Sequence, residues 1–304
     1  MLTTNELRRI AARSGARQIA YVEIDVILTH LLQLFHERAL FEHLVFKGGT
    51  MLRKMIFGKR GRLSTDLDFT LGSSIRRDDL MLKLLEALSE PYRGLTFNVG
   101  NDNDWYLADD SCGVNPLCIH TDNATGARIK LQVSLREHPI LATLPKKQLS
   151  QEYFEALDFV PADIASLAFE EALAEKLRAA SQRSKIRDLH DLSESLNIDF
   201  DKGLVRGLAV LKMWNQGDSL SYATLASRVT SAKDYDVGDL TQLLRKDQRV
   251  ELATLTKRVV EGFKFLGNLS EIEARLVQDK ERKESDCATQ LIEQLREWKA
   301  GIDA

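Results

Sequence analysis

Asp66 and Asp68 have the spacing that lets two carboxylates share a metal ion. They alternate with Leu67 and Phe69, so a strand here would bury the apolar pair and turn both acids to one face. Two adjacent carboxylates repel each other, and Mg²⁺, or Mn²⁺ in its place, relieves that repulsion. The spacing also fits two solvated residues on an exposed strand. Ser64 falls on the same face, where its hydroxyl would contact a phosphate oxygen or only cap the strand.

A glycine pair precedes the acidic run. Gly48 and Gly49 stand between Lys47 and Thr50, and glycine lets backbone N–H groups approach a phosphate closely because it has no side chain. Such a pair often marks a plain turn. Here a short apolar segment, the pair, a helix and the acidic strand follow one another, so glycines and carboxylates would meet at one edge. Together they predict a site for a divalent cation and a nucleoside triphosphate (NTP).

The size and composition describe an ordinary globular protein. The chain has 304 residues, of which 44% are hydrophobic and 29% charged, and this length favours two domains or one domain with a large helical annex. The three cysteines lack metal-ligand spacing and are expected to be reduced thiols in the cytoplasm. We find no apolar signal core and no apolar stretch of about 18 residues, so we expect no membrane partner.

Two segments are basic and contain no acidic residue. Such segments would form a groove for a phosphodiester backbone, or they would remain solvated surface charge. They span residues 43–65, with Lys47, Arg53, Lys54, Lys59, Arg60 and Arg62, and residues 176–187, with Lys176, Arg178, Arg183, Lys185 and Arg187.

Hydrophobic periodicity divides the chain into a mixed part and a helical part. We predict a first domain over residues 1–160 and a helical second domain over 161–304. In the first we expect two helices within 4–40, strands at 44–46, 66–71, 95–99, 117–120 and 128–135, and helices at 50–57 and 77–88. In the second we expect helices near 163–181, 186–195, 202–214, 221–228, 237–245, 249–264 and 270–299.

Two later motifs complete a pattern. Lys176 stands in the run Glu175-Lys176-Leu177-Arg178-Ala179, and Asp191 in the run Arg187-Asp188-Leu189-His190-Asp191-Leu192. With the glycine pair and the acidic run, these motifs resemble the nucleotidyltransferase-fold toxins of the AbiEii type, which include the MenT toxins. The resemblance covers about residues 25 to 195. The order of Lys185 and Arg187 departs from the family's Arg-x-Lys order, which keeps the charge but not the guanidinium geometry.

The resemblance implies an α+β protein: a nucleotidyltransferase-fold core with a short mixed sheet, preceded by N-terminal helices and followed by a large helical domain. It implies a toxin of a toxin–antitoxin or phage-defence system that moves a nucleoside monophosphate from an NTP to an acceptor hydroxyl and releases pyrophosphate. In the MenT branch the acceptor is the 3′ end of tRNA, whose modification blocks aminoacylation and translation. A cognate antitoxin protein is expected as a partner.

The resemblance also implies roles for individual residues. Asp66 and Asp68 would hold Mg²⁺, Lys176 would neutralise phosphate, and Asp191 would orient the acceptor or the metal. Lys176 also fits an ordinary solvated helix position. The residues expected at the nucleotide are Lys47, Gly48, Gly49, Thr50, Ser64, Lys176 and Arg187.

One position departs from the nucleotidyltransferase pattern. Where a third carboxylate is common on a later strand, this chain has Gln132, and an amide binds cations weakly and cannot accept a proton from a hydroxyl. Asp191 would substitute for it, or the site has two acids only. Two alternatives stay open: a transferase that modifies a protein, and, because of Gln132, a silent NTP-binding module. Trp105 and Tyr106, in an expected polar loop, would stack on a base or anchor that loop.

Overall fold

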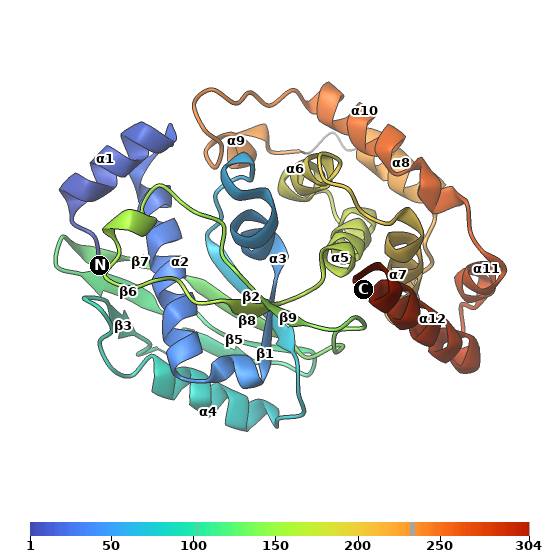
Figure 1. Ribbon diagram of the computed structural model, residues 1–304, viewed down its shortest axis with the longest axis horizontal. Helices are drawn as coiled ribbons and strands as arrows, with labels where there is room; N and C mark the ends of the chain where they lie inside the picture. The colour runs from blue at the N-terminus through green and yellow to red at the C-terminus, as the bar shows by residue number, and fades with distance from the viewer. Residues whose placement is uncertain (102, 232–234, 304) are drawn as a thin grey trace. The chain divides into compact units, whose positions relative to one another are not determined.

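The computed structural model describes residues 1–303 except 102 and 232–234, and Figure 1 shows the order of the elements along the chain. The chain folds into two compact units. Unit 1 comprises Met1–Pro139, Thr143–Leu167 and Gln242–Gln248, and unit 2 comprises Ile140–Ala142, Ala168–Thr241 and Arg249–Ala304. The segment Gln242–Gln248, which we call the strap, thus belongs to unit 1 although both of its flanks belong to unit 2.

A mixed seven-stranded sheet forms the centre of unit 1. Its order is β4-β5-β8-β2-β1-β10-β9. β2 runs antiparallel to β1 and parallel to β8, and β1 runs parallel to β10. The strands are β1 Leu44–Lys47, β2 Asp66–Leu71, β4 Trp105–Leu107, β5 Ser111–Val114, β8 Lys130–Ser134, β9 Leu144–Lys146 and β10 Ile164–Ser166. A second sheet contains β3 Thr96–Asn98, β6 Leu117–His120 and β7 Asn123–Arg128 in the order β3-β6-β7.

The helices of unit 1 follow the expected hydrophobic periodicity. α1 Thr4–Ser14 begins with a capping box between Thr3 and Glu6, and α4 Arg77–Ala87 buries one apolar side. α2 Ile19–Glu37 is, within the described part of the chain, the one helix long and apolar enough by length and composition to cross a membrane. α2 is not an unbroken apolar stretch, because Glu23 and Asp25 interrupt it. In addition, 67% of its apolar window is buried inside the structure, as in a core helix of a globular protein.

Unit 2 is helical, and one buried acid joins its segments. Glu171 on α5 is fully buried, accepts hydrogen bonds from the backbone of Ile140 and Leu141, and pairs with Lys212 on α7 at 3.0 Å. The helices of this unit are α5 Phe169–Gln182, α6 Ile186–Ser195, α7 Lys202–Trp214, α8 Tyr222–Ser231, α9 Val237–Thr241, α10 Leu252–Gly262, α11 Glu271–Gln278 and α12 Ser285–Asp303. An apolar core connects the helices other than α9. The predicted α+β class is confirmed.

Three predicted helices have the wrong limits, and one of them, expected over 237–245, ends at Thr241. The helix expected near 163–181 begins only at Phe169, because Ile164–Ser166 forms β10 beside β1, with Ser166 opposite Phe46. The helix expected over 270–299 is interrupted between α11 and α12. There the carboxylate of Asp279 accepts hydrogen bonds from the backbone of Glu284 and the indole of Trp214, and these contacts replace helical ones.

A buried ion cluster joins α2 to the helical turn that follows β1. That turn consists of α3 Gly48–Met51 and a π-helical segment, η2 Leu52–Phe57. The ammonium of Lys54 on η2 is fully buried and bonds to the Asp25 carboxylate at 2.9 Å, the Thr29 hydroxyl at 2.8 Å and the Tyr153 hydroxyl at 3.0 Å. Arg53 contacts the other carboxylate oxygen of Asp25 at 3.3 Å. Burial alone would raise the pKa of Asp25, but these two cations outweigh it and hold the pKa at about 2.

Lys54→Met removes the cation while Asp25 stays buried. We expect the free energy of unfolding to fall by about 3 kcal/mol at neutral pH, because the buried carboxylate loses its shorter ion pair and keeps only the longer contact with Arg53. Urea unfolding measures the change. The control is Lys59→Met, which removes a lysine with a 56% exposed side chain from the adjoining turn and should cost less than about 1 kcal/mol. Equal losses in the two variants would contradict a stabilising role for the buried cluster.

The same cluster makes stability depend on pH in a defined window. The pKa of Asp25 lies near 2 in the folded chain and near 3.8 ordinarily, so its contribution is complete above the ordinary value and is lost as the pH falls from about 4 to about 2. Unfolding of the wild type and of Asp25→Asn across this range should show a steeper acid loss in the wild type. Parallel curves would refute this assignment.

Candidate active site

The glycine turn and the acidic strand meet at the end of β1. β1 and β2 are antiparallel with Lys47 opposite Asp68, and the chain leaves β1 through Gly48, whose φ is +81°. A Cβ atom on Gly48 would lie 2.4 Å from Oδ2 of Asp68. Only glycine accommodates both this backbone conformation and this close approach. The glycine turn and the Asp68 carboxylate therefore lie in contact, as the order of motifs predicts.

Thr50 and Ser64 differ from their expected roles at the phosphate. Thr50 is 1% exposed, and its hydroxyl donates to the backbone carbonyl of Asp66. Ser64 is 5% exposed, which leaves it little surface for a ligand. Both predictions of direct phosphate contact are thus unsupported by the geometry: Thr50 ties the glycine turn to the acidic strand, and Ser64 is buried just before that strand begins.

Gln132 takes the position at which a third carboxylate was expected. β8 runs parallel to β2 with Gln132 beside Asp68 and Lys130 beside Asp66. Residues in register on neighbouring strands present their side chains to the same face. The acidic face of β2 is thus flanked on this side by an amide and a cation.

Tyr106 continues the same row across the sheet. It lies on β4 opposite Gly113, and Gly113 on β5 lies beside Gln132. A Cβ on Gly113 would come within 2.6 Å of the Tyr106 ring, so the absence of a side chain there makes room for the ring. Burial raises the pKa of Tyr106, and the charge of Asp68 adds to the rise. The expected loop at Trp105 and Tyr106 is therefore a strand, which directs this tyrosine toward the acids.

An open cavity of about 700 Å³ lies beside Asp66. Among its lining residues, Arg128 pairs with Asp104, whose second oxygen accepts hydrogen bonds from the backbone of Gly100 and Asn101. The other lining side chains are polar as well: Thr65, Asn103, Asn115 and Lys130. The sequence interpretation missed Arg128 and Lys130. The signal for Lys130 was its alternation with Gln132, which places both on one face of β8.

Asp66 and Asp68 fit a divalent cation by their chemistry. Carboxylate oxygens are the ligands that Mg²⁺ prefers, and Mg²⁺ commonly takes one or two carboxylates together with substrate phosphates and water. Within the described residues, no group of three or more histidine, cysteine, aspartate and glutamate side chains is placed to hold a metal alone. The acidic strand thus offers two protein ligands and leaves the others to the substrate.

Lys176 and Asp191 are in contact within unit 2. The Lys176 ammonium lies 2.8 Å from Asp191 on α6 and 3.0 Å from Asp188, and both carboxylates are almost fully buried. Arg183 binds the second oxygen of Asp188 at 2.8 Å. Burial would raise the pKa of Asp188, and the two cations lower it below its usual range. Asp188 is therefore paired with both Lys176 and Arg183. The joint action of Lys176 and Asp191 with the acidic strand stays a prediction.

Most cations of the two basic segments are engaged inside their own units. In the first segment Arg53 and Lys54 belong to the buried cluster, and Lys59 pairs with Glu152. In the second, Arg187 pairs with Asp239 through both nitrogens of its fork. Acids distant in sequence thus neutralise these cations, and a groove built from the two segments stays a prediction.

The sequence of residues 30–286 matches the family described as nucleotidyl transferase AbiEii toxin, type IV TA system. The chain belongs to this family. The AbiEii match spans most of the chain and confirms the resemblance seen in the motifs. No curated protein sequence matches this AbiEii-family chain.

Among solved structures, this AbiEii-family chain is similar to MenT4, a nucleotidyltransferase toxin from Mycobacterium tuberculosis. The identity is 28%, the match covers 97% of this chain and 100% of MenT4, and the TM-score is 0.79. Two Helicobacter pylori structures also match. A nucleotidyltransferase structure has 19% identity, and the match covers 80% of this chain and 94% of that structure with a TM-score of 0.48. For JHP933 the identity is 21%, the match covers 87% of this chain and 97% of JHP933, and the TM-score is 0.44.

Gly48→Ala should distort this AbiEii-family site. The new Cβ would collide with the Asp68 carboxylate, and alanine disfavours positive φ, so we expect the free energy of unfolding to fall by at least about 1–2 kcal/mol. Gly100→Ala is the control, because nothing lies within 4 Å of a Cβ at Gly100. Urea unfolding of both variants makes the comparison. A Gly48→Ala protein as stable as Gly100→Ala would argue against the contact.

Lys176→Met should destabilise the protein as well as affect any activity. Asp188 and Asp191 would remain buried with less compensation, and we expect a loss of about 3–5 kcal/mol in the free energy of unfolding. Lys185→Met, which changes an exposed lysine at the start of α6, should leave stability within about 0.5 kcal/mol of the wild type. If Lys176→Met unfolds at the wild-type urea concentration, the ion cluster contributes nothing to the fold.

Proposed function

We propose that this toxin is a Mg²⁺-dependent nucleotidyltransferase that moves a nucleoside monophosphate from an NTP to the 3′ end of tRNA, which blocks aminoacylation and translation. The observation that carries the proposal is the contact between the Gly48 turn and the Asp68 carboxylate. This contact brings a backbone suited to phosphate and a ligand suited to Mg²⁺ to one point. The likeness to MenT4 over nearly the whole chain supports the same reaction class.

Different residues on this face would bind the phosphate and the metal ion. Backbone N–H groups at Gly48 and Gly49 would bind phosphate oxygens, while Asp66 and Asp68 would hold the cation. When bound, Mg²⁺ neutralises charge on the triphosphate and on the departing pyrophosphate. Lys47, opposite Asp68 on β1, contributes positive charge at the same edge. These groups orient the NTP so that an acceptor hydroxyl attacks its α-phosphorus in line with the leaving pyrophosphate.

The cavity beside Asp66 is suited to the acceptor. It presents the Arg128 guanidinium and the Lys130 ammonium for phosphate, and asparagine amides for ribose or base. Its position next to Asp66 would bring a terminal ribose close to the cation. Tyr106, whose ring lies over Gly113 on the same face, supplies an aromatic surface near the reacting groups.

We propose that the second domain also supplies residues to the reaction. Residues 161–304 would contribute Lys176, Asp191 and Arg187, with Lys176 balancing phosphate charge and Asp191 orienting the acceptor or the metal. We further propose that the toxin acts in the cytoplasm, in a toxin–antitoxin or phage-defence role, and is restrained by a cognate antitoxin protein, as the family assignment suggests.

A second candidate rests on Gln132. Because it lies in register with Asp68 where a third acid was expected, the chain has lost a potential proton acceptor at that strand. A protein with this site would bind NTP with Mg²⁺ and transfer nothing. The two functions differ in one observable, which is covalent labelling of an acceptor.

The decisive experiment incubates purified protein with total tRNA, Mg²⁺ and each α-labelled NTP in turn, and separates RNA from protein on one gel. We expect label on tRNA with a preferred NTP. Asp66→Asn should reduce it at least about 100-fold, because loss of a metal ligand removes several kcal/mol of charge stabilisation in the transition state. Omitting Mg²⁺ should abolish it.

The matched control is Asp109→Asn, since Asp109 is an exposed acid of the same unit. This variant should label tRNA at the wild-type rate. Label on protein instead of RNA would identify a protein acceptor and overturn the tRNA proposal. Mg²⁺-dependent NTP binding without any label would establish the silent module.

A further inference from the structure

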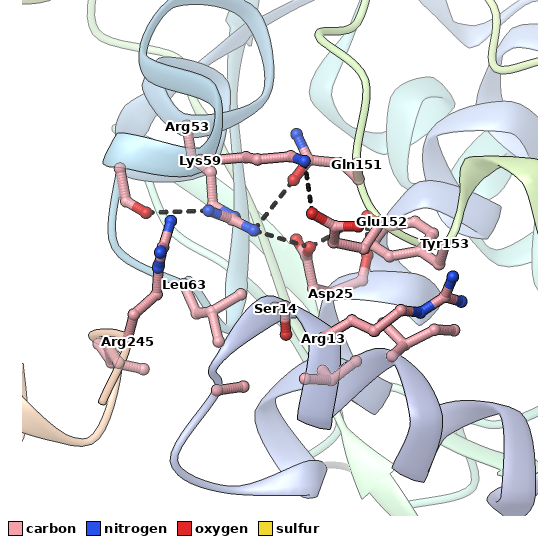
Figure 2. Close-up of a pocket in the computed structure, with 15 residues that line it drawn as sticks. Arg13, Ser14, Asp25, Arg53, Lys59, Leu63, Gln151, Glu152, Tyr153 and Arg245 are labelled. Atoms are coloured by element: carbon pink, nitrogen blue, oxygen red, sulfur yellow. Dashed lines mark hydrogen bonds and ion pairs between the residues drawn. The ribbon is translucent and has the colours of Figure 1, made fainter. Parts of the chain in front are cut away.

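Unit 1 contains a second cavity, of about 310 Å³, which we call the strap cavity (Figure 2). Its charged lining consists of Arg13, Arg53, Lys59 and Arg245, with Asp25 and Glu152. All of these residues belong to unit 1, and Arg245 comes from the strap. None of the predicted nucleotide or metal residues lines this cavity, so it is separate from the candidate active site.

Positive charge predominates in the strap cavity. Its lining has four cations against two carboxylates, a surplus of two positive charges. Two neighbours pair with the lining, Lys54 with Asp25 and Asp247 with Arg245, and because they have opposite charges the surplus is unchanged. A ligand with about two negative charges would balance the cavity.

Three cations of the cavity act on one carboxylate. The pKa of Glu152 is lowered, mainly by its hydrogen bond from Lys59, and the charges of Arg13 and Arg245 add to this effect. Three cations from three separate segments thus act on the same carboxylate. Among the described residues, Arg13 has no hydrogen-bond or ion-pair partner, and it is one of the residues that line the cavity in Figure 2. The cavity therefore retains capacity for a further anion.

Arg53 carries a donor that the fold leaves unused. Its terminal nitrogens bind the carbonyls of Gly58 and Gly61, the Gln151 side chain and Asp25, whereas its Nε is buried and has no hydrogen-bond partner among the described residues. This nitrogen is covered by protein atoms, so it does not open onto the cavity, and Arg53 contributes to the cavity through the charge of its guanidinium.

The floor of the cavity is apolar. Ile10, Val22, Leu63 and Leu243 line it, and they belong to the same small core of unit 1. A cavity of about 300 Å³ or more with apolar walls and a few convergent polar groups has the properties of a small-molecule site. The ligand should therefore combine an anionic group with an apolar part.

We propose that the strap cavity binds a small phosphate monoester. A phosphate monoester carries about 1.5 to 2 negative charges near neutral pH, which matches the surplus of two positive charges. The planar guanidinium of Arg13 suits phosphate oxygens, and the other cations contribute charge. The apolar part of the ligand would lie on Ile10 and Leu63. The proposal concerns unit 1 alone and does not depend on the proposed transferase activity.

Such a ligand would hold the strap against the start of the acidic strand. The backbone N–H of Leu63 donates to the carbonyl of Leu243 at 2.8 Å, and Leu63 precedes Asp66 by three residues. Lys246 and Ala16 connect the strap to the end of α1. Binding would thus join three segments of unit 1 that are distant in sequence and raise the protein's thermal stability by mass action.

The test uses isothermal titration calorimetry on the full chain without divalent cations, with phenyl phosphate as the probe. We expect saturable binding at one site in the millimolar range or below. Benzoate, with one negative charge, should bind more weakly, and benzyl alcohol should not bind. Arg13→Gln and Arg245→Gln should each weaken phenyl phosphate about tenfold, the loss expected for one charged hydrogen bond.

Arg9→Gln is the matched control, because Arg9 is exposed on the same helix as Arg13 and does not line the cavity. It should bind phenyl phosphate like the wild type, and urea unfolding should show that all three variants are folded. Absence of saturable binding would overturn the proposal. So would wild-type affinity in the Arg13→Gln/Arg245→Gln double variant, since the probe would then bind elsewhere.

Discussion

The pairing of Lys54 with Asp25 fixes the segment on which the candidate site depends. Lys54 lies on η2, which follows directly from α3 and the glycine turn, and its ammonium is bound entirely by groups from α2 and Tyr153. Two contacts therefore fix the turn: the buried ion pair of Lys54, and the hydrogen bond from the Thr50 hydroxyl to the backbone carbonyl of Asp66. A charge that is fully buried and fully bonded allows few alternative positions. The consequence is a glycine turn of fixed position beside an acidic strand.

The sequence was informative where chemistry and local pattern coincide. The alternation of Asp66 and Asp68 with apolar neighbours specified a strand with one acidic face, and the structure contains that strand as β2. The order of the motifs placed Gly48 beside it, and the family assignment agrees. These features depend on neighbouring residues, which is why one sequence sufficed to predict them.

Features that depend on distant partners were not predictable in the same way. A lysine in a basic run resembles surface charge until the partner 29 positions earlier is known, as Lys54 and Asp25 show. β10 is three residues long and is defined by pairing with β1 rather than by its own pattern. Tyr106 seemed to belong to a loop because its strand is short, and its place depends on the missing side chain of Gly113. In each case tertiary contacts outweigh local propensity.

Because of the strap, the two units are not consecutive along the chain: part of unit 1 lies between two segments of unit 2. Because the chain enters unit 2, returns for Gln242–Gln248 and leaves again, a fragment ending at Leu167 would lack Leu243, which is 1% exposed in the small core with Leu63. Such a fragment would have an incomplete core, although it contains every strand of the described residues. A single cut between the halves of this chain would therefore separate the strap from the N-terminal part that it completes. A recombinant of this chain would keep the small core intact only if the strap moved together with that part.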